Sequence, residues 1–274
     1  MSLIQRRAGD LVYHVAQNLE SIPAVGHGFS TRLGGVSTGM LASMNLRSAD
    51  TSGDEPERVL ENYRRFCTAI GADLTRAVLS CQVHGDTVRT VTQEDAGKGL
   101  FIPRDYEADG LITNVPGLPL FVFSADCMVL LLCDPEAGCV GAVHAGWRGT
   151  AREIARKTVE RMTEVYGARP EHIRAAIGPG IGVCCFETDE DVPLAMERAS
   201  GQDAAPFLQK RGRKWMVDLK GLNRRQLELA GVPAGQIEVS DLCTACHPEL
   251  YWSHRKMGNA RGVQGAAILW KGPV

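Results

Sequence analysis

Short apolar runs, separated by turn-forming and amphipathic stretches, recur along the whole chain. The two longest runs lie within residues 120–145, and their Val- and Leu-rich composition between Gly, Pro and Asp predicts buried core strands. Shorter runs of the same kind predict further strands at Leu11–Val15, Val25–Phe29, Ala77–Val83, Thr87–Val91, Asp109–Thr113, Ile173–Ile177, Trp215–Val217 and, as the last clear strand, Gln236–Ser240. We expect Ala77–Val83 and Thr87–Val91 to pair with each other around the turn at residues 84–86.

Four stretches combine helical periodicity with recognisable start and stop residues, and they predict helices at about 56–70, 150–166, 189–199 and 218–229. Pro56 and Gly71 bound the first helix, Thr150 is a candidate N-cap of the second, and Asp218 of the fourth. Some strands follow one another directly and others are separated by helices, which predicts an α/β (α+β) fold of mixed β-sheets. No linker-like stretch interrupts the pattern, so we expect residues 1–274 to form one domain.

Composition narrows the classes of function. Of the 274 residues, 44% are hydrophobic and 23% are charged, which is ordinary for a globular protein with a substantial core. The formal net charge of −2 provides no basic surface, so we expect no nucleic-acid partner. No apolar run reaches about 18 residues and the N-terminus lacks an apolar secretory core, so we expect no membrane partner and a cytoplasmic location. In that reducing compartment the nine cysteines would be mostly free thiols.

Three residues that can bind a metal follow apolar runs. Cys127 and His144 end the two core runs, and His84 comes directly after a third run and before a glycine. Two imidazoles and one thiolate would hold a divalent metal with the fourth position open, as in catalytic zinc sites. Their wide spacing matches no local zinc motif, so the residues alone favour a structural cysteine and two hydrogen-bonded histidines. Asp86 and Asp126 are either carboxylates that orient the imidazoles or ordinary turn residues.

Two motifs rich in cysteine and glycine admit several interpretations. Residues 243–247 read CTACH, the spacing of a c-type haem attachment site, but haem attachment requires export and no export signal is recognisable. A redox dithiol is another interpretation, and we favour a structural or pocket-lining role. Residues 178–183, GPGIGV, lack the helix and distant acidic residue of a dinucleotide-binding loop, so they predict only a tight turn.

Two arginines are candidates for binding an anion. Arg32 lies in STRLGGVS, where backbone N–H groups and a guanidinium can bind phosphate. Arg148 lies just before an expected helix, whose N-terminus favours negative charge. The neighbouring Trp147 is a candidate for stacking on a base, or a packed core residue. Further candidates are His27, as a polar group of the pocket, and Asp109, which can instead fix the turn before its strand.

Many separate motifs, in the same order, make the chain resemble the YfiH/laccase-domain family, also called the multicopper polyphenol oxidase or purine nucleoside phosphorylase family. The motifs are GFSTRLGGVS, MNL, QVHG, ADGLIT, ADCMVLLL, HAGWRGT, IGPGIG with CCFE, and CT with a following C and P, and they span residues from about 27 to 265. One segment departs from the family pattern, because WSHRKMGNARGVQG lacks the usual tyrosine-containing block and has His254 in its place. The role of that segment in substrate fit is therefore open.

The resemblance implies packed mixed β-sheets with outer helices, related to the catalytic domain of cytotoxic necrotizing factor. It also implies Zn²⁺, with Cu²⁺ able to take its place, bound by His84, Cys127 and His144. The same motifs strengthen Arg32 as a phosphate-binding catalytic residue, together with Asn45 of the MNL motif. The full set of expected site residues is His84, Cys127, His144 and Arg32 as catalytic, and Asn45, Arg148, Asp109 and His27 as substrate-binding.

The resemblance implies a zinc-dependent purine nucleoside phosphorylase that converts adenosine, inosine or methylthioadenosine and phosphate to base and ribose-1-phosphate, with an adenosine deaminase activity. A typical zinc deaminase has an HxE motif, which this chain lacks, so its proton donor is unassigned. A copper-dependent polyphenol oxidase is the first alternative, although seven histidines are too few for a full multicopper assembly. A metal-free cysteine hydrolase or amidase, with Cys127 as nucleophile and His144 as base, is another. The expected partners are small molecules, a nucleoside and phosphate, bound by a monomer or small homo-oligomer.

Overall fold

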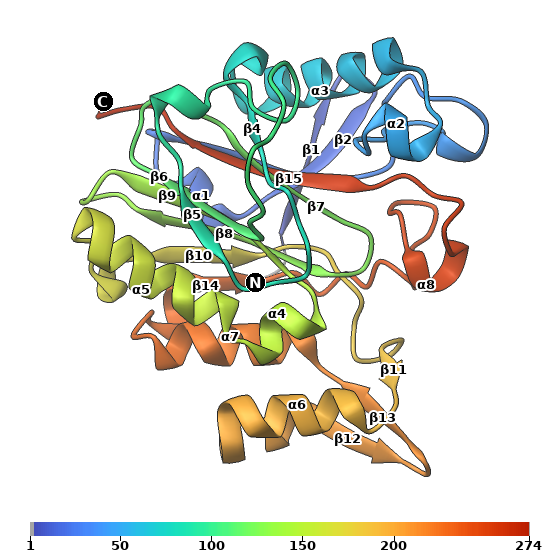
Figure 1. Ribbon diagram of the computed structural model, residues 1–274, viewed down its shortest axis with the longest axis vertical. Coiled ribbons are helices and arrows are strands. Elements are labelled where there is room, and N and C mark those ends of the chain that lie inside the picture. Colours follow the sequence, from blue (N-terminus) through green and yellow to red (C-terminus); the bar gives the residue numbers. More distant parts are fainter. Residues whose placement is uncertain (1–2, 274) are drawn as a thin grey trace.

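A computed structural model describes residues 3–273 and shows a mixed α/β fold with three sheets and helices on the outside (Figure 1). The first sheet has six strands, in the order β1 (Ile4–Ala8), β2 (Leu11–Val15), β3 (Val25–Ser30), β15 (Gln264–Trp270), β7 (Leu120–Ser124) and β4 (Val78–Leu79). Strand β15 pairs antiparallel with both β3 and β7. The two ends of the described chain therefore belong to the same sheet.

The second sheet also has six strands and carries most of the candidate site. Its order is β14 (Ile237–Val239), β10 (Arg174–Ile177), β8 (Met128–Asp134), β9 (Cys139–Ala145), β6 (Gly110–Thr113) and β5 (Val88–Thr90). Strands β8 and β9 form an antiparallel hairpin in which Val129 lies opposite His144. Both strands are buried along their whole length, as their uninterrupted apolar sequence predicts.

The two large sheets pack face to face, and helices cover their outer faces (Figure 1). Leu131 of β8 and Ile268 of β15 are fully buried in the cluster between the sheets. Helix α3 (Pro56–Ile70) covers the first sheet, and α5 (Ile154–Tyr166) and α7 (Leu219–Leu229) cover the second. Burial of each large apolar side chain in these layers contributes about 1.5–3 kcal/mol before entropy is counted.

A small three-stranded sheet lies below the second sheet in Figure 1, beside helix α6 (Asp191–Ser200). Its strands, in spatial order, are β11 (Glu187–Thr188), β13 (Lys214–Val217) and β12 (Leu208–Arg211). Within residues 3–273 there are also four shorter helices: α1 (Gln17–Glu20), α2 (Ala49–Ser52), α4 (Trp147–Ala151) and α8 (His254–Met257). Single 3₁₀ turns lie at Gly39–Leu41, Leu74–Arg76, Gln93–Asp95, Pro170–His172, Gly201–Asp203, Ala205–Phe207 and Ala234–Gln236.

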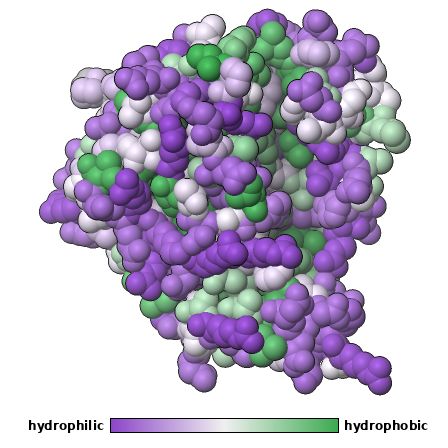
Figure 2. Space-filling model, viewed as in Figure 1, coloured by the Kyte–Doolittle hydropathy of each residue, from purple (hydrophilic) through white to green (hydrophobic). Residues whose placement is uncertain are grey.

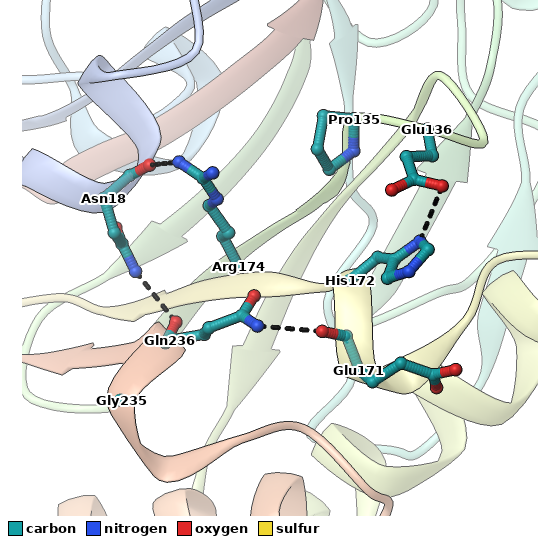
Figure 3. A pocket seen from close by; sticks show the side chains of 8 residues that line it. All are labelled: Asn18, Pro135, Glu136, Glu171, His172, Arg174, Gly235 and Gln236. Atoms are coloured by element: carbon teal, nitrogen blue, oxygen red, sulfur yellow. Dashed lines mark hydrogen bonds and ion pairs between the residues drawn. The ribbon is translucent and has the colours of Figure 1, made fainter.

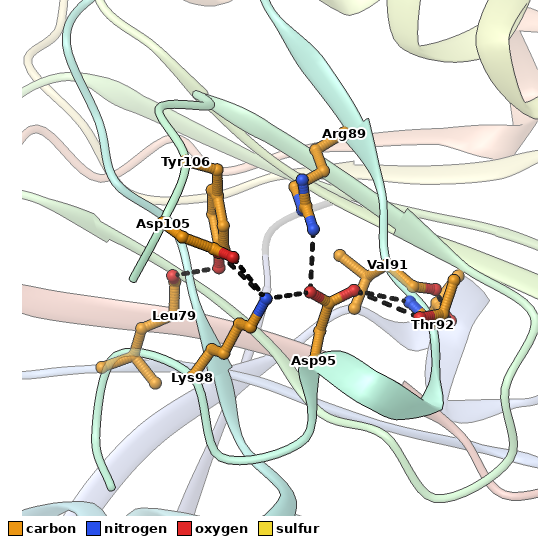
Figure 4. A network of polar contacts seen from close by, with 9 residues as sticks. Leu79, Arg89, Val91, Thr92, Asp95, Lys98, Asp105 and Tyr106 are labelled. Carbon is orange, nitrogen blue, oxygen red and sulfur yellow. Dashed lines mark hydrogen bonds and ion pairs between the residues drawn. The ribbon is translucent and has the colours of Figure 1, made fainter. Parts of the chain in front are cut away.

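A buried carboxylate organises the loop that connects β5 to β6 (Figure 4). Asp95 accepts hydrogen bonds from Arg89 at 2.8 Å and from the N–H of Thr92 at 2.9 Å, and it pairs with Lys98 at 3.0 Å. Burial opposes ionisation of Asp95, but these donors outweigh it and lower its pKa to about 2. The network fixes the start of a long connection and so helps to position β6, which follows it.

The face of the molecule in Figure 2 is mostly hydrophilic, with hydrophobic residues in separate patches. Within residues 3–273, none of the helices has the length and apolar character needed to cross a membrane.

The structure confirms most of the expected strands and helices but corrects the pairing of two of them. Strand β4 pairs in parallel with β7 of the first sheet, and β5 pairs in parallel with β6 of the second. The expected hairpin around residues 84–86 is therefore wrong. The two strands diverge at this turn because each finds a longer apolar neighbour in a different sheet, and the turn crosses between the sheets.

The second expected helix is also corrected, because it is divided into α4 and α5. Helix α4 begins at Trp147 after Gly146, and Glu153 then adopts a left-handed conformation with φ of 59° before α5 begins. Thr150 lies inside α4 and accepts a hydrogen bond from Asn223 instead of capping a helix. The two expected core runs form three strands, β7, β8 and β9. Strands β1, β11, β12 and β15 were not expected: the first three are rich in polar residues, and β15 begins with Gln, Gly and two Ala.

Candidate metal centre and its cavity

Three segments that are distant in sequence meet at one point beside the second sheet. His84 lies in the loop between β4 and β5, Cys127 in the turn between β7 and β8, and His144 near the end of β9. One potential ligand atom from each lies within 4.8 Å of the others. The two imidazoles meet edge to face, with ring centroids 4.9 Å apart. The convergence that the sequence predicted for these three residues is present.

The β8–β9 hairpin and two backbone features account for this convergence. Met128 pairs with Ala145, so Cys127 lies beside the strand end that carries His144. His84 adopts a left-handed conformation with φ of 58°, which reverses the chain at the site. At Gly146, an added Cβ would lie 2.9 Å from Cδ2 of His84 and 3.3 Å from Sγ of Cys127. A side chain at position 146 would therefore displace the metal-binding atoms.

Asp109 is the carboxylate that orients the site. Its oxygens accept hydrogen bonds from the N–H groups of Val83, His84 and Gly85 at 3.1, 3.1 and 2.8 Å, and one oxygen lies 2.7 Å from Nδ1 of His144. Asp109 is completely buried; burial opposes its ionisation, but the His144 hydrogen bond and the backbone donors lower its pKa. An ionised Asp109 assigns the proton of His144 to Nδ1 and leaves Nε2 free to bind a metal.

Asp86 and Asp126, the other two candidate orienting carboxylates, have different partners. Asp86 forms ion pairs with Lys157 and Arg152 at the surface. Asp126 accepts hydrogen bonds from the hydroxyl of Thr244 at 2.6 Å and from the N–H of Arg255 at 2.7 Å. Asp126 therefore holds two later segments of the chain against the turn that carries Cys127.

The charge of the site favours a thiolate. Burial opposes ionisation of Cys127, but the positive charge of His144 and hydrogen bonds from both imidazoles lower its pKa to about 6. Burial likewise disfavours a charged His144, but Cys127 and Asp109 raise its pKa to about 9. Without a metal, the buried pair is therefore a thiolate and an imidazolium at neutral pH, and a metal that displaced the proton from Nε2 of His144 would find one thiolate and two imidazoles. This donor set suits a divalent ion such as zinc or copper.

A cavity of about 320 Å³ opens beside these three residues, and both His84 and Cys127 line it. Trp147, Ile181, Phe186 and Leu219 give it apolar walls, and His254, Arg255 and Arg261 add basic or polar groups. This volume lies at the lower end of the range for small-molecule sites. Apolar walls with a few charged groups suit a flat aromatic molecule that carries an anion.

The sequence did not single out Ile181, Phe186, Arg255 or Arg261 as site residues. The two arginines lie in the segment that departs from the family pattern, and the fold brings this segment to the site because β15 follows it. The only sign in the sequence that this segment could bind an anion was the closeness of the two arginines, at positions 255 and 261. Ile181 lies in the glycine-rich segment at residues 178–183, and Phe186 lies just after it. This segment carried no recognisable ligand motif.

Arg32, Asn45 and His27 lie outside the lining of this cavity. The guanidinium of Arg32 donates to the carbonyl oxygens of Pro248 and Ala42 at 2.7 and 3.0 Å, and it stacks 3.9 Å above the ring of Trp252. These contacts tie the glycine-rich loop that contains Arg32 to the segment that precedes Arg255.

Asn45 and His27 have equally specific structural partners. Asn45 is fully buried, donates to Asp54 at 2.8 Å and accepts from the N–H groups of Arg47 and Val263. His27, on β3, accepts a hydrogen bond from a backbone N–H at 2.9 Å, and burial lowers its pKa to about 4. Arg148 differs from them, because it lies on α4 and stacks 4.3 Å from the ring of its neighbour Trp147 at the cavity.

A different depression of about 450 Å³ lies between α1, β10 and the loop before β14 (Figure 3). Several of its polar groups have partners within the protein: the guanidinium of Arg174 donates to the backbone carbonyl of Asn18, the side-chain amide of Gln236 donates to that of Glu171, and His172 pairs with Glu136. The buried Oδ1 of Asn18 has no hydrogen-bond partner among the described residues. None of the three candidate metal ligands lines this depression.

Comparisons with known proteins show the family and the fold of the chain. Residues 26–271 match the family described as multi-copper polyphenol oxidoreductase laccase. A protein of Deinococcus radiodurans named purine nucleoside phosphorylase is 42% identical over 245 residues, which are 89% of each chain. A protein from an unknown prokaryotic organism named adenosine deaminase RL5 is 34% identical, over 93% of this chain and 97% of the relative.

The crystal structure of YlmD from Geobacillus stearothermophilus has the same fold. It superposes with a TM-score of 0.90 at 33% sequence identity, covering 99% of this chain and all of that one. The fold that the sequence predicted, packed mixed sheets with outer helices, is thereby confirmed.

Proposed function

Because the chain belongs to the multi-copper polyphenol oxidoreductase laccase family, and relatives are named as purine nucleoside enzymes, we propose that it is a metal-dependent enzyme acting on purine nucleosides. Its reactions would be phosphorolysis of adenosine, inosine or methylthioadenosine, and deamination of adenosine. The observation that carries the proposal is the convergence of His84, Cys127 and His144 beside the cavity of about 320 Å³.

We propose that these three residues hold Zn²⁺, or Cu²⁺ in its place. When bound, zinc supplies Lewis-acid activation of an oxygen atom at its open position. Asp109 is a positioning residue, since it fixes the tautomer of His144 and, through the N–H of His84, the loop that presents the other imidazole.

The cavity walls suggest roles for the groups that contact substrate. Trp147 and Phe186 provide aromatic surfaces against which a purine ring can pack. Arg255 and Arg261 provide positive charge for phosphate, and Arg148 beside Trp147 is a further candidate. In phosphorolysis, a phosphate oxygen bonds to C1′ of the ribose while the bond to the purine breaks. Holding both reactants in one small cavity supplies the orientation that this step requires.

Arg32, Asn45 and His27 fit supporting roles better than direct contact with substrate. The polar groups of Asn45 and the two terminal nitrogens of Arg32 already have partners within the protein. Arg32 and Asn45 contact the chain on both sides of the segment that carries Arg255 and Arg261. We propose that they hold this segment in place, so their loss would raise KM more than it lowers kcat.

The test is to incubate the purified full chain with adenosine and phosphate, with and without a chelator, and to separate the products by chromatography. Adenine with ribose-1-phosphate, or inosine, is expected, and the chelator should abolish both until zinc is restored. Cys127→Ala should lose activity, whereas Cys81→Ser, at a thiol outside the site, should retain it. The proposal is wrong if no nucleoside is converted by the metal-loaded protein, and oxygen-dependent oxidation of phenols would then favour the copper alternative.

One observation favours a second candidate function. Cys127, His144 and Asp109 form a continuous series of hydrogen-bonded groups, as in a cysteine hydrolase, and the pKa of the thiol is lowered to about 6. A metal-free hydrolase or amidase would be insensitive to chelators and inactivated by alkylation of Cys127. The chelator arm of the same experiment distinguishes the two candidates.

A further inference from the structure

Four cysteines outside the candidate active site lie together at the edge of the same cavity wall. Cys184 and Cys185 are in the loop between β10 and β11, and Cys243 and Cys246 are in the loop after β14. All four Sγ atoms lie within 4.8 Å of one another. Sγ of Cys246 is 3.6 Å from that of Cys184 and 3.4 Å from that of Cys185. The CTACH motif thus has two further thiols as neighbours.

Backbone hydrogen bonds bring the two loops together, and one cysteine sulfur accepts a further hydrogen bond between them. Gly180 and Cys243 form an isolated parallel bridge, and the N–H of Thr244 donates to the carbonyl of Gly180 at 3.1 Å. The N–H of Gly182 donates to Sγ of Cys243 at 3.1 Å. An added Cβ at Gly182 would lie 3.2 Å from both Sγ of Cys184 and Cβ of Cys243. The glycine therefore permits the close approach of the two cysteine pairs.

We propose that these four cysteines bind one zinc-class divalent ion in a closed, structural site, separate from the candidate active site. A tetrahedral ion with zinc–sulfur bonds of about 2.3 Å would place its sulfur atoms about 3.8 Å apart. The measured separations of 3.4 and 3.6 Å are close to that value and far from the length of about 2.05 Å in a disulfide. Cys243 and Cys246 also have the Cys-x₂-Cys spacing found in structural zinc sites.

The chemistry of the surroundings agrees with a bound cation of this class. Four thiolates form a soft donor set, which selects zinc or a similar ion over magnesium or calcium. The site would carry an excess of two negative charges, and the buried ammonium of Lys220 interacts electrostatically with Cys243 and Cys184. Cys184 and Cys246 are exposed, and exposed thiols in contact with one another oxidise readily unless a metal occupies them.

The proposed ion would cross-link the two cysteine-containing loops beside the candidate active site. Ile181 and Phe186, in the first loop, line the cavity. Thr244, in the second loop, donates its hydroxyl to Asp126, which is adjacent to Cys127. Fixing the loops therefore fixes one wall of the cavity. This inference does not depend on the proposed function, because its test measures metal content.

The experiment measures the metal content of the purified full chain and four variants by plasma mass spectrometry. Wild type is expected to contain two equivalents of metal, one in each site. Cys246→Ser and Cys127→Ala should each contain one equivalent, and the double variant should contain no bound metal. Cys81→Ser, which removes a thiol outside both clusters, should retain the wild-type content. Cobalt added to apo Cys127→Ala should give the intense thiolate charge-transfer and tetrahedral d–d absorption of a sulfur-only site.

The cobalt measurement keeps the test decisive if Cys246→Ser fails to fold. Absence of that absorption, or unchanged metal content in a folded Cys246→Ser, would overturn the proposal. So would disulfide bonds among these cysteines in the native, unreduced protein, because they would identify a redox cluster instead.

Discussion

At the scale of single residues, the hydrogen bonds of Asp109 connect the two histidine-bearing segments of the candidate metal centre. One carboxylate holds the imidazole of His144 and three consecutive N–H groups of the loop that carries His84. No equivalent pattern is visible in the sequence, where ADG reads as an ordinary turn before a strand. The residues alone favoured a structural cysteine and two hydrogen-bonded histidines, and the family motifs pointed to His84, Cys127 and His144 as ligands, which stays a prediction. The orienting role of Asp109 could not be predicted, because it depends on pairing between β6 and β9.

Asp109→Asn tests this role with little change in volume. The amide keeps the shape but loses the charge that stabilises the Nδ1–H tautomer of His144. We expect zinc affinity to fall about 10–100-fold, as measured by competition with a chromophoric chelator. Asp86→Asn is the matched control, because Asp86 only forms surface ion pairs, worth at most about 1 kcal/mol. Equal affinities for the two variants would contradict the assigned role.

The lowered pKa of Cys127 gives a second prediction at this scale. In the metal-free protein the thiolate should persist above pH 6 and be lost as the pH falls through that value, because the pKa is about 6 instead of the usual 9.0. The rate of alkylation by iodoacetamide, followed by peptide mass spectrometry at Cys127, should therefore rise around pH 6. A rise only around pH 9 would show that His144 and His84 do not stabilise the thiolate.

At the scale of elements, the sequence predicted where most strands lie, but not their lengths or which strands pair. β8 and β9 were predictable because a short turn joins two apolar runs, and such neighbours pair directly. β4 and β5 were misassigned, since local sequence does not show that each belongs to a different sheet. β15 was missed because it begins with Gln264 and the small residues Gly265, Ala266 and Ala267, so that only its last three residues form a strongly apolar run.

The junction between β9 and α4 gives an element-scale prediction. Gly146 caps α4, and a Cβ there would press on His84 and Cys127 at 2.9 and 3.3 Å. Gly146→Ala should therefore weaken metal binding by about tenfold or more, since overpacking typically costs 1–3 kcal/mol. Chelator competition and circular dichroism would separate this loss from unfolding. Gly235→Ala, where the added Cβ meets open space, should bind metal like wild type.

At the scale of the whole molecule, the first sheet is complete only when the C-terminal strand β15 takes its place within it. β15 lies between β3 and β7, so residues from the beginning, middle and end of the chain share one sheet. The segment just before β15 carries Arg255 and Arg261 into the cavity. Completion of the fold and completion of the site therefore depend on the same late segment, a coupling that no local sequence pattern reveals.

Ile268→Ala tests how far the packing of the two sheets depends on β15. Ile268 is fully buried in the cluster between the sheets, so removing its outer carbons leaves a cavity and should lower the free energy of unfolding by about 2–5 kcal/mol. Urea unfolding followed by circular dichroism measures the change. Leu229→Ala, at a side chain that is 44% exposed, should shift stability by about 0.5 kcal/mol or less. If both variants unfolded at the same urea concentration, β15 would not be part of the shared core, and its position between β3 and β7 would be wrong.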